Sequence, residues 1–362
     1  MTMLMGKLKV MLAMAFFISL ASCIEEDGNT PTDANSEYDS AEAYLEELGF
    51  TGSVLISKGD EYLLKRGFGM ADQSYNIPND PELIYRIGSI TKSFTAAAVV
   101  KLKRDGYINS LDQPLSDFAA DFPYGDQITI KHLMNHQSGI PDYVGPVEDY
   151  AEENNYHFDP EEIFEIIIES IEEDGLDFTP GEFFAYSNSN YLILGLLIEA
   201  LTDLSYQEYL SQNIYAPLNL NHTGKGPDTI SGEERAKGYD NGQEVGPYQM
   251  QIAYSAGEIE SNIEDLEKWG KALLSDFFTE GEKELIFAPP LEQNDINVPG
   301  AGFFTLKIND QVIYHHGGDI AGFTSLLVLI PESEGLIILL SNEQDKSEER
   351  YQIMEAIIKN EF

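Results

Sequence analysis

Strand-like hydrophobic patterns lie at both ends of the chain, and helical patterns fill its middle. Residues 52–72 hold two strand-like runs around a Lys-Gly-Asp-Glu turn, which predicts a hairpin. Residues 302–309, 311–318 and 323–342 are also strand-like, and we expect the last run to be a second hairpin. Residues 107–250 are mostly helical in pattern. This order predicts an α+β fold: an antiparallel sheet built from N- and C-terminal segments, flanked by helices, with a mainly helical insertion.

The predicted helices divide the folded part of the chain into two regions. We expect a short helix near Ala41, where folded structure begins, and longer helices over residues 159–175, 190–203, 261–276 and 348–362. The only tryptophan, Trp269, lies on one of these helices and is expected in the core. The prediction is one catalytic domain over residues 41–362, with an α/β part at 41–106 and 251–362 and a helical part at 107–250.

The N-terminus has the pattern of an export signal. Lys7 and Lys9 precede an apolar run, residues 10–21, that is too short to span a bilayer as a helix. The sequence Leu-Ala-Ser-Cys ending at Cys23 resembles a bacterial lipobox, in which the cysteine becomes the lipidated first residue. We therefore expect a signal peptide at 1–22, a flexible tether at 23–40, and an exported bacterial lipoprotein that is periplasmic or at the outer membrane or cell surface. Because Cys23 is the only cysteine, the chain cannot form an intramolecular disulfide.

The charge balance narrows the possible partners. The chain carries 21 basic and 63 acidic residues, a formal net charge of −42. Nucleic acids and anionic lipid surfaces repel such a surface, so neither is expected as a partner.

A candidate nucleophile and base lie one helical turn apart in the segment Tyr85–Gly106. Ser89 stands at the expected helix start and Lys92 three residues later, so the two side chains face the same side. The positive end of a helix favours a developing oxyanion, and a neutral lysine can take the hydroxyl proton. The pKa of Lys92 must then be lowered by burial or by a nearby cation. The S-x-x-K spacing alone is weak, because a chain of this length is expected to contain it by chance.

Two further motifs make the S-x-x-K signal more specific. Tyr186, Ser187 and Asn188 form a Y-x-N sequence, and residues 316–318 read His-Gly-Gly. With Ser89 and Lys92 these resemble the three motifs of class C-like serine β-lactamases, a superfamily that includes DD-peptidases, penicillin-binding proteins, D-aminopeptidases and esterases. The resemblance runs from about residue 50 to residue 342, and it rests on the order and spacing of several short motifs.

The resemblance implies a role for each of these residues. It makes Ser89 the acylated nucleophile, Lys92 its base and Tyr186 the group that passes the proton to the leaving group. Asn188 is expected to contact the acyl side chain of the substrate and Lys92. His316 stands where the family has a lysine, and Gly318 allows the substrate to approach an edge strand. The backbone N–H groups of Ser89 and Asp319 are expected to form the oxyanion hole.

His316 departs from the lysine of the K-T-G version of the third motif, and this difference affects the expected substrate. The lysine of the K-T-G version is a permanent cation suited to a substrate carboxylate, whereas a histidine is expected to be only partly charged near pH 7. We therefore expect weaker, pH-dependent carboxylate binding. The resemblance implies hydrolysis of an amide, ester or β-lactam carbonyl without a metal or organic cofactor. It leaves open whether the substrate is a β-lactam, a D-amino-acid peptide or an ester.

Three alternatives compete with this interpretation. Ser255, in Ala-Tyr-Ser-Ala-Gly after a strand-like run, is one glycine short of the nucleophile elbow of α/β-hydrolases. His132 and His136 have the i, i+4 spacing of zinc ligands but lack the accompanying glutamate. The third alternative is a catalytically inactive binding or sensor module on the same fold, against which the intact Ser89 and Lys92 argue.

Overall fold

A computed structural model describes residue 38, residues 40–287 and residues 298–362. The predicted signal peptide, Cys23 and the predicted tether except for residues 38 and 40 lie outside the described residues. Among the described helices none is long and apolar enough to cross a membrane.

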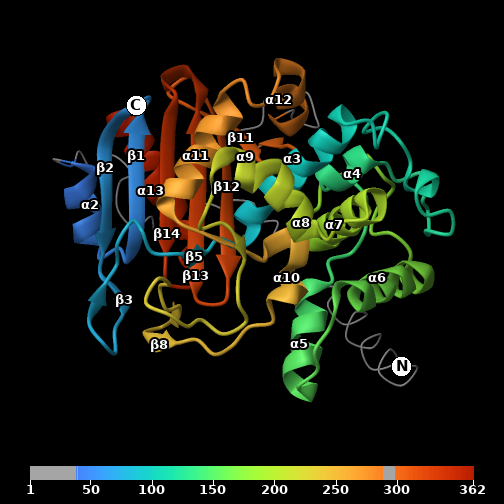
Figure 1. Ribbon diagram of the computed structural model, residues 1–362, viewed down its shortest axis with the longest axis horizontal. Helices are drawn as coiled ribbons and strands as arrows, with labels where there is room; N and C mark the ends of the chain where they lie inside the picture. The colour runs from blue at the N-terminus through green and yellow to red at the C-terminus, as the bar shows by residue number, and fades with distance from the viewer. Residues whose placement is uncertain (1–37, 39, 288–297) are drawn as a thin grey trace, which may run out of the picture.

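A seven-stranded antiparallel sheet forms one side of the molecule (Figure 1), and its strands come from both ends of the chain. The spatial order is β10-β11-β12-β13-β14-β1-β2, so the N-terminal hairpin pairs with the C-terminal strands through β1 and β14. The strands are β1 (Gly52–Lys58), β2 (Glu61–Phe68), β10 (Val298–Pro299), β11 (Phe304–Ile308), β12 (Gln311–Ile320), β13 (Phe323–Ile330) and β14 (Gly335–Ser341). The predicted antiparallel α+β fold is confirmed.

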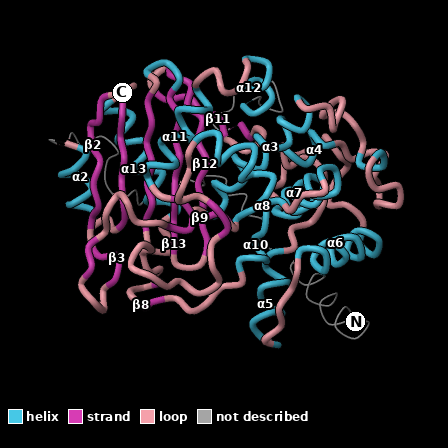
Figure 2. The backbone as a smooth tube through the Cα atoms, in the orientation of Figure 1, coloured by secondary structure: helices cyan, strands magenta, loops and turns pink. Residues whose placement is uncertain are grey.

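Helices cover both faces of this sheet and extend beyond it into a helical region on one side (Figure 2). They are α2 (Ala41–Leu48), α3 (Thr91–Arg104), α4 (Ile130–Met134), α5 (Val144–Asn154), α6 (Pro160–Asp174), α7 (Asn188–Thr202), α8 (Tyr206–Leu210), α9 (Ala216–Leu218), α10 (Met250–Gly257), α11 (Ile263–Leu274), α12 (Glu280–Phe287) and α13 (Ser347–Glu361). Short turns of helix are η1 (Gly88–Ile90), η2 (Leu115–Asp117), η3 (Ser211–Tyr215) and η4 (Pro331–Ser333). Small ladders are formed by β3 (Met70–Asp72), β4 (Ile77–Pro78), β5 (Tyr85–Arg86), β6 (Gly224–Lys225), β7 (Tyr239–Asp240), β8 (Gln243–Glu244) and β9 (Ile259–Ser261).

The two faces of the sheet bury two separate sets of side chains. Successive strand residues point to opposite faces, so Leu326 and Val328 of β13 pack with α2 and α13, whereas Leu327 and Leu329 pack with α3 and α11. Both faces are apolar because both are covered. Burial at about 25 cal/mol per Å² of apolar surface makes this two-sided core the main source of stability.

Helix α3 lies between the sheet and the helical region. Its alanine run, Ala96 to Ala98, is fully buried, as small side chains at a close helix contact require. Trp269 of α11 is also fully buried; its ring stacks on Phe94 at a centroid distance of 4.3 Å and its indole N–H donates to Ser93. These contacts confirm the core position predicted for the tryptophan and hold the helix that begins just after Ser89.

Candidate active site

Ser89 lies in the turn η1 that leads directly into α3, with Lys92 in the first turn of that helix. Ser89 is partly exposed, whereas Lys92 has no exposed surface. The Nζ atom of Lys92 is 3.1 Å from the Oγ atom of Ser89. The spacing of three residues thus places the hydroxyl and the amine in hydrogen-bond contact, as expected from the sequence.

Two other acceptors surround the amine of Lys92. Nζ donates to the side-chain Oδ1 of Asn188 at 2.8 Å and to the backbone carbonyl of Ala256 at 2.8 Å. With Ser89 these make three partners, the number that a charged ammonium group can satisfy. Lys92 is therefore fully hydrogen-bonded despite its burial, by residues from η1, α7 and α10.

Asp142 fixes the orientation of the Asn188 amide. Its Oδ2 atom accepts from the backbone N–H of Asn188 at 2.9 Å and from the side-chain Nδ2 at 2.8 Å. An ionised carboxylate only accepts hydrogen bonds, so the amide nitrogen of Asn188 must face Asp142 and its amide oxygen must face Lys92.

The electrostatics of the site favour a lysine that titrates near neutral pH. Burial lowers the pKa of Lys92 to about 7, and the negative charge of Asp142 opposes this by raising it. A neutral amine has two N–H groups and one lone pair. Because Asn188 Oδ1 and the Ala256 carbonyl can only accept, Ser89 is the one neighbour of the three that can donate to that lone pair.

Tyr186 lies against the same amine. Its ring centroid is 4.9 Å from Nζ of Lys92, and the ring stacks on the imidazole of His136 at a centroid distance of 4.4 Å. Its hydroxyl shares a hydrogen bond with Ser89, while burial raises the pKa of the phenol. The structure thus brings a neutral phenol, the hydroxyl of Ser89 and the amine of Lys92 together.

Strand β12 passes beside Ser89 through its second half. Strand β11 pairs with Gln311–His315 only, so from His316 onward β12 is paired on one side, with β13. One face of this half of β12 lies against the residue that precedes η1: a methyl group on Gly318 would lie 2.0 Å from the carbonyl oxygen of Ile87. The glycine is therefore required for contact between the strand and the turn that carries Ser89, which is a different reason from the substrate approach expected from the sequence.

The protonation state of His316 differs from the one expected from the sequence. It is buried, and its Nδ1 lies 2.6 Å from the carbonyl oxygen of Gly317. Burial, with the nearby charge of Lys92 as the next cause, lowers the pKa of His316 to about 3. The expectation of a partly charged histidine near pH 7 is wrong, because the sequence did not reveal that this end of β12 is covered.

The backbone of Asp319 lies next to the Ser89 turn, and its side chain points to the opposite side of the strand. A methyl group on Gly88 would lie 2.9 Å from the backbone nitrogen of Asp319, so this nitrogen lies next to the Ser89 turn. The side chain forms an ion pair with Arg350 of α13 at 2.8 Å. This arrangement matches the alternation of a strand and leaves only the N–H of Asp319 for the proposed oxyanion hole.

The Ser255 alternative is contradicted by the structure. The strand-like run expected before it, residues 248–252, enters helix α10 at Met250, and Ser255 within this helix is fully buried. Its hydroxyl donates to the carbonyl of Tyr191 at 2.8 Å. A short apolar run does not distinguish a strand from a buried helix, which explains the error. The antiparallel main sheet also lacks the parallel βαβ units of an α/β-hydrolase.

The zinc-like histidine pair is also contradicted. Helix α4 ends at Met134, and His136 beyond it has a positive φ of 54°, so the two histidines do not share a helix face. His132 accepts from the backbone N–H of Thr129 at the start of α4, and His136 interacts with the backbone of Ser187. Among the residues that the structure describes, no group of three histidine, cysteine or carboxylate side chains could hold a metal ion.

Three further parts of the site were not predicted from the sequence: Asp142, His136 and the carbonyl of Ala256. Asp142 follows the Ser-Gly-Ile-Pro segment in a stretch that contributed to the family resemblance, and this was its only signal. A backbone carbonyl leaves no signal in a sequence, so the contribution of Ala256 could not be predicted.

Comparisons with known proteins identify the family of the chain. Residues 41–358 match the sequence profile of the family described as Beta-lactamase. Putative penicillin-binding protein PbpX of Bacillus subtilis (strain 168) is 28% identical over 309 residues, 84% of this chain and 73% of that protein. Protein flp of Staphylococcus aureus (strain NCTC 8325 / PS 47) is 30% identical over 306 residues, 80% of this chain but 59% of that protein.

A solved structure of a similar protein has the same fold. The octameric penicillin-binding protein homologue from Pyrococcus abyssi superposes with a TM-score of 0.77 at 27% identity, covering 88% of this chain and 76% of that one. With most of the domain matched by the profile, the chain belongs to the Beta-lactamase family, the superfamily of serine β-lactamases and penicillin-binding-protein-like hydrolases.

Proposed function

We propose that the protein is a serine hydrolase in which Ser89 is acylated by an amide, ester or β-lactam carbonyl and Lys92 acts as its base. The single observation that carries the proposal is the hydrogen-bond arrangement around Nζ of Lys92. Once this amine is neutral, its lone pair has one hydroxyl donor among its three partners, Ser89, because Asn188 and Ala256 offer only acceptors.

Acylation then follows from the positions of these groups. Lys92 takes the hydroxyl proton as the Oγ atom of Ser89 attacks the carbonyl carbon, and the negative charge that develops on the carbonyl oxygen is met by the N–H groups of Ser89 and Asp319. The leaving group departs with a proton passed from Lys92 through the phenol of Tyr186, which leaves an ester on Ser89. Attack by water on this ester releases the acid and restores the Ser89 hydroxyl.

The neutral state of His316 supports a class of substrate. A carbonyl oxygen accepts only, so the hydrogen on Nδ1 is donated to Gly317 and Nε2 of His316 keeps a lone pair. Such a group accepts a hydrogen bond from a substrate N–H or O–H and does not attract a carboxylate. This favours an ester or a D-amino-acid amide or peptide over substrates that depend on a cation at this position.

A panel of substrates tests the proposal. We expect the wild-type protein to hydrolyse at least one member of a set of short-chain esters, D-amino-acid amides, D-Ala-D-Ala peptides and β-lactams. Ser89→Ala and Lys92→Ala should each abolish that activity, while Ser255→Ala should retain the activity if it folds. Equal turnover by Ser89→Ala and the wild-type protein would contradict the proposal.

We further propose that the protein is exported and anchored through a lipid on Cys23. The basic n-region, the short apolar run and the lipobox-like residues before Cys23 support this. Metabolic labelling with a palmitate analogue in a bacterial host should mark the wild-type chain but not Cys23→Ser. Equal labelling of both chains would contradict the proposal.

A further inference from the structure

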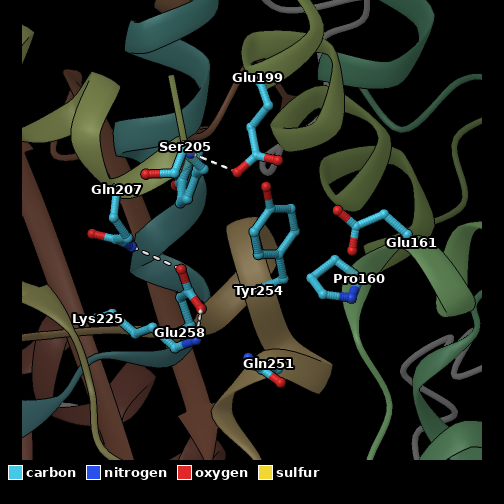
Figure 3. Close-up of a pocket in the computed structure, with 10 residues that line it drawn as sticks. Pro160, Glu161, Glu199, Ser205, Gln207, Lys225, Gln251, Tyr254 and Glu258 are labelled. Carbon is cyan, nitrogen blue, oxygen red and sulfur yellow. Dashed lines mark hydrogen bonds and ion pairs between the residues drawn. The ribbon is translucent and has the colours of Figure 1, made fainter. Parts of the chain in front are cut away.

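Two sets of polar side chains lie at opposite ends of α7, and they differ in what they contact. The set near the C-terminal end lines a pocket (Figure 3), in which Glu258 is paired with Gln207 and Lys225, and Tyr254 with Glu199. These pairs account for the polar groups of the pocket without a ligand. The set at the N-terminal end of α7 lies next to the active site.

His136, in this second set, is tied to both neighbours of Tyr186 in the chain. Its backbone carbonyl accepts from the N–H of Ala185 at 3.0 Å, and its ring Nδ1 accepts from the N–H of Ser187 at 3.1 Å. The imidazole also stacks on the phenol of Tyr186, with ring centroids 4.4 Å apart and 24° between the ring planes. One residue thus holds the backbone on either side of Tyr186 and one face of its ring.

The neighbours of Nδ1 determine which nitrogen of the His136 ring carries the hydrogen. The N–H of Ser187 can only donate, and the side-chain Nδ2 of Asn190 lies 3.4 Å from the same atom. Asn190 has this orientation because its Oδ1 accepts from the hydroxyl of Ser138. The carbonyl of Ser187 is also 3.1 Å from Nδ1, but as the N-cap of α7 it accepts the first hydrogen bond of that helix. Nδ1 is therefore the acceptor, and Nε2 carries the hydrogen.

The fold holds His136 in this position against a backbone preference. Its φ of 54° is one that a residue other than glycine rarely adopts, and its side chain is buried. Such conformations persist only where the surrounding structure enforces them, and they are concentrated at functional sites. Tyr186 needs an anchor of this kind, because residues 183–187 form neither helix nor strand.

We propose that His136 is a positioning residue that fixes the phenol of Tyr186 for proton delivery to the leaving group. The inference rests on the proposed function, in which this proton originates from Lys92. As the bond to the leaving group breaks, the Tyr186 O–H gives its proton to the departing atom, and the phenolate takes a proton from the Lys92 ammonium group. His136 therefore matters in proportion to how much the leaving group needs that proton.

The test compares two phosphonates that differ only in the leaving group, bis(4-nitrophenyl) butylphosphonate and diphenyl butylphosphonate. The measurement is the rate at which each modifies Ser89 of the full chain, followed by intact mass. The weakly basic 4-nitrophenoxide leaves without a proton, whereas the more basic phenoxide gains from an acid. The ratio of the two rates therefore reports on the proton from Tyr186, while a general loss of stability or of access to the site changes both rates alike.

The variants separate the hydrogen bond of His136 from its ring. His136→Asn keeps an acceptor near the position of Nδ1 and suits the positive φ, but it loses the ring stack. His136→Gln carries the same amide one bond farther from the backbone and loses both contacts. Tyr186→Phe removes the acid itself. His157→Asn makes the matched substitution at an exposed histidine and is the control.

We expect His136→Gln to slow the diphenyl phosphonate about tenfold more than the 4-nitrophenyl phosphonate, since a misplaced acid loses part of a contribution on the order of 10²–10⁴. His136→Asn should change the ratio by about threefold, the effect of losing an aromatic contact, and His157→Asn should not change it. In the Tyr186→Phe background, His136→Gln should leave the ratio unchanged, because residues that act through one group are not additive. Equal slowing of both phosphonates by His136→Gln, or the same effect of this substitution without the Tyr186 hydroxyl, would overturn the proposal.

The Tyr186→Phe variant also separates this inference from the function on which it rests. If Tyr186→Phe leaves the rate ratio of the wild-type protein unchanged, the role of Tyr186 as acid fails, and that of His136 fails with it. If Tyr186→Phe changes the ratio but no His136 variant that folds by circular dichroism does, the proposed function stands and this inference alone is wrong. A wild-type protein that neither phosphonate modifies at Ser89 would contradict the proposed function itself.

Discussion

The carboxylate of Asp142 receives two hydrogen bonds from Asn188, one from its backbone N–H at 2.9 Å and one from its side-chain amide at 2.8 Å. This pair leaves the side-chain oxygen of Asn188 directed at Lys92, 2.8 Å from Nζ. In this orientation the amide presents only its oxygen, an acceptor, to Lys92, so it cannot donate a hydrogen bond to the amine. Asp142 is therefore a positioning residue for the proposed base, although it does not contact Lys92 directly.

Replacement of Asp142 by Asn tests this role. Loss of the charge that raises the pKa of Lys92 should shift the pH dependence of Ser89 acylation to lower pH. Loss of the fixed amide orientation should also lower the plateau rate, by about tenfold for one misplaced hydrogen bond. The measurement is the rate of modification by a serine-reactive phosphonate between pH 5 and 9.

Asp149→Asn is the matched control for this experiment, because it removes the same charge from an exposed position on α5. Its pH profile should overlay that of the wild-type protein. Identical profiles for Asp142→Asn and wild type would show that Asp142 does not act on Lys92.

The wild-type pH profile tests the state of Lys92 itself. Burial lowers its pKa to about 7, so the neutral, reactive fraction rises from about a tenth at pH 6 to about nine tenths at pH 8. The acylation rate should rise about tenfold over this interval and then level off. Burial lowers the pKa values of His136 and His316 and raises that of Tyr186, so these neighbours should not titrate within it. A rate that is flat or falls from pH 6 to pH 8 would contradict the role of Lys92 as base.

His316 should remain neutral across the physiological range. Its pKa is lowered to about 3, chiefly by burial, and the imidazole donates to Gly317. The ring resonances of His316, assigned by their loss in His316→Gln, should not move between pH 5 and pH 8 in two-dimensional NMR spectra. A titration with a midpoint near 6.5, the ordinary value for a histidine, would instead restore the partly charged state inferred from the sequence.

Gly318 should not tolerate a side chain. A methyl group there would lie 2.0 Å from the Ile87 carbonyl oxygen, so Gly318→Ala must move β12 or the turn that carries Ser89. We expect a loss of about 1–3 kcal/mol in the free energy of unfolding, the usual cost of overpacking, together with slower acylation of Ser89. Gly281→Ala is the control, because a methyl group at this exposed position in α12 meets no atom within 4 Å. Equal stability and acylation in both variants would show that the approach of β12 to Ile87 is not required.

The parts of the structure that depend on local pattern could be predicted from the sequence. The hairpin of β1 and β2 followed from two strand-like runs around a turn, and the contact of Ser89 with Lys92 followed from the spacing of three residues. The state of His316 could not be predicted in this way, because its burial depends on residues far away in the chain. For the same reason the role of Asp142 was missed, since its partner is 46 residues away.

The most direct test of the account is intact mass followed by peptide mapping after treatment with a broad phosphonate serine-hydrolase probe. We expect a single adduct, on Ser89, that is formed by the wild-type protein and lost in Lys92→Ala. An adduct on another serine, or an adduct on Ser89 that forms equally well without Lys92, would contradict the central claim that these two residues are the nucleophile and its base.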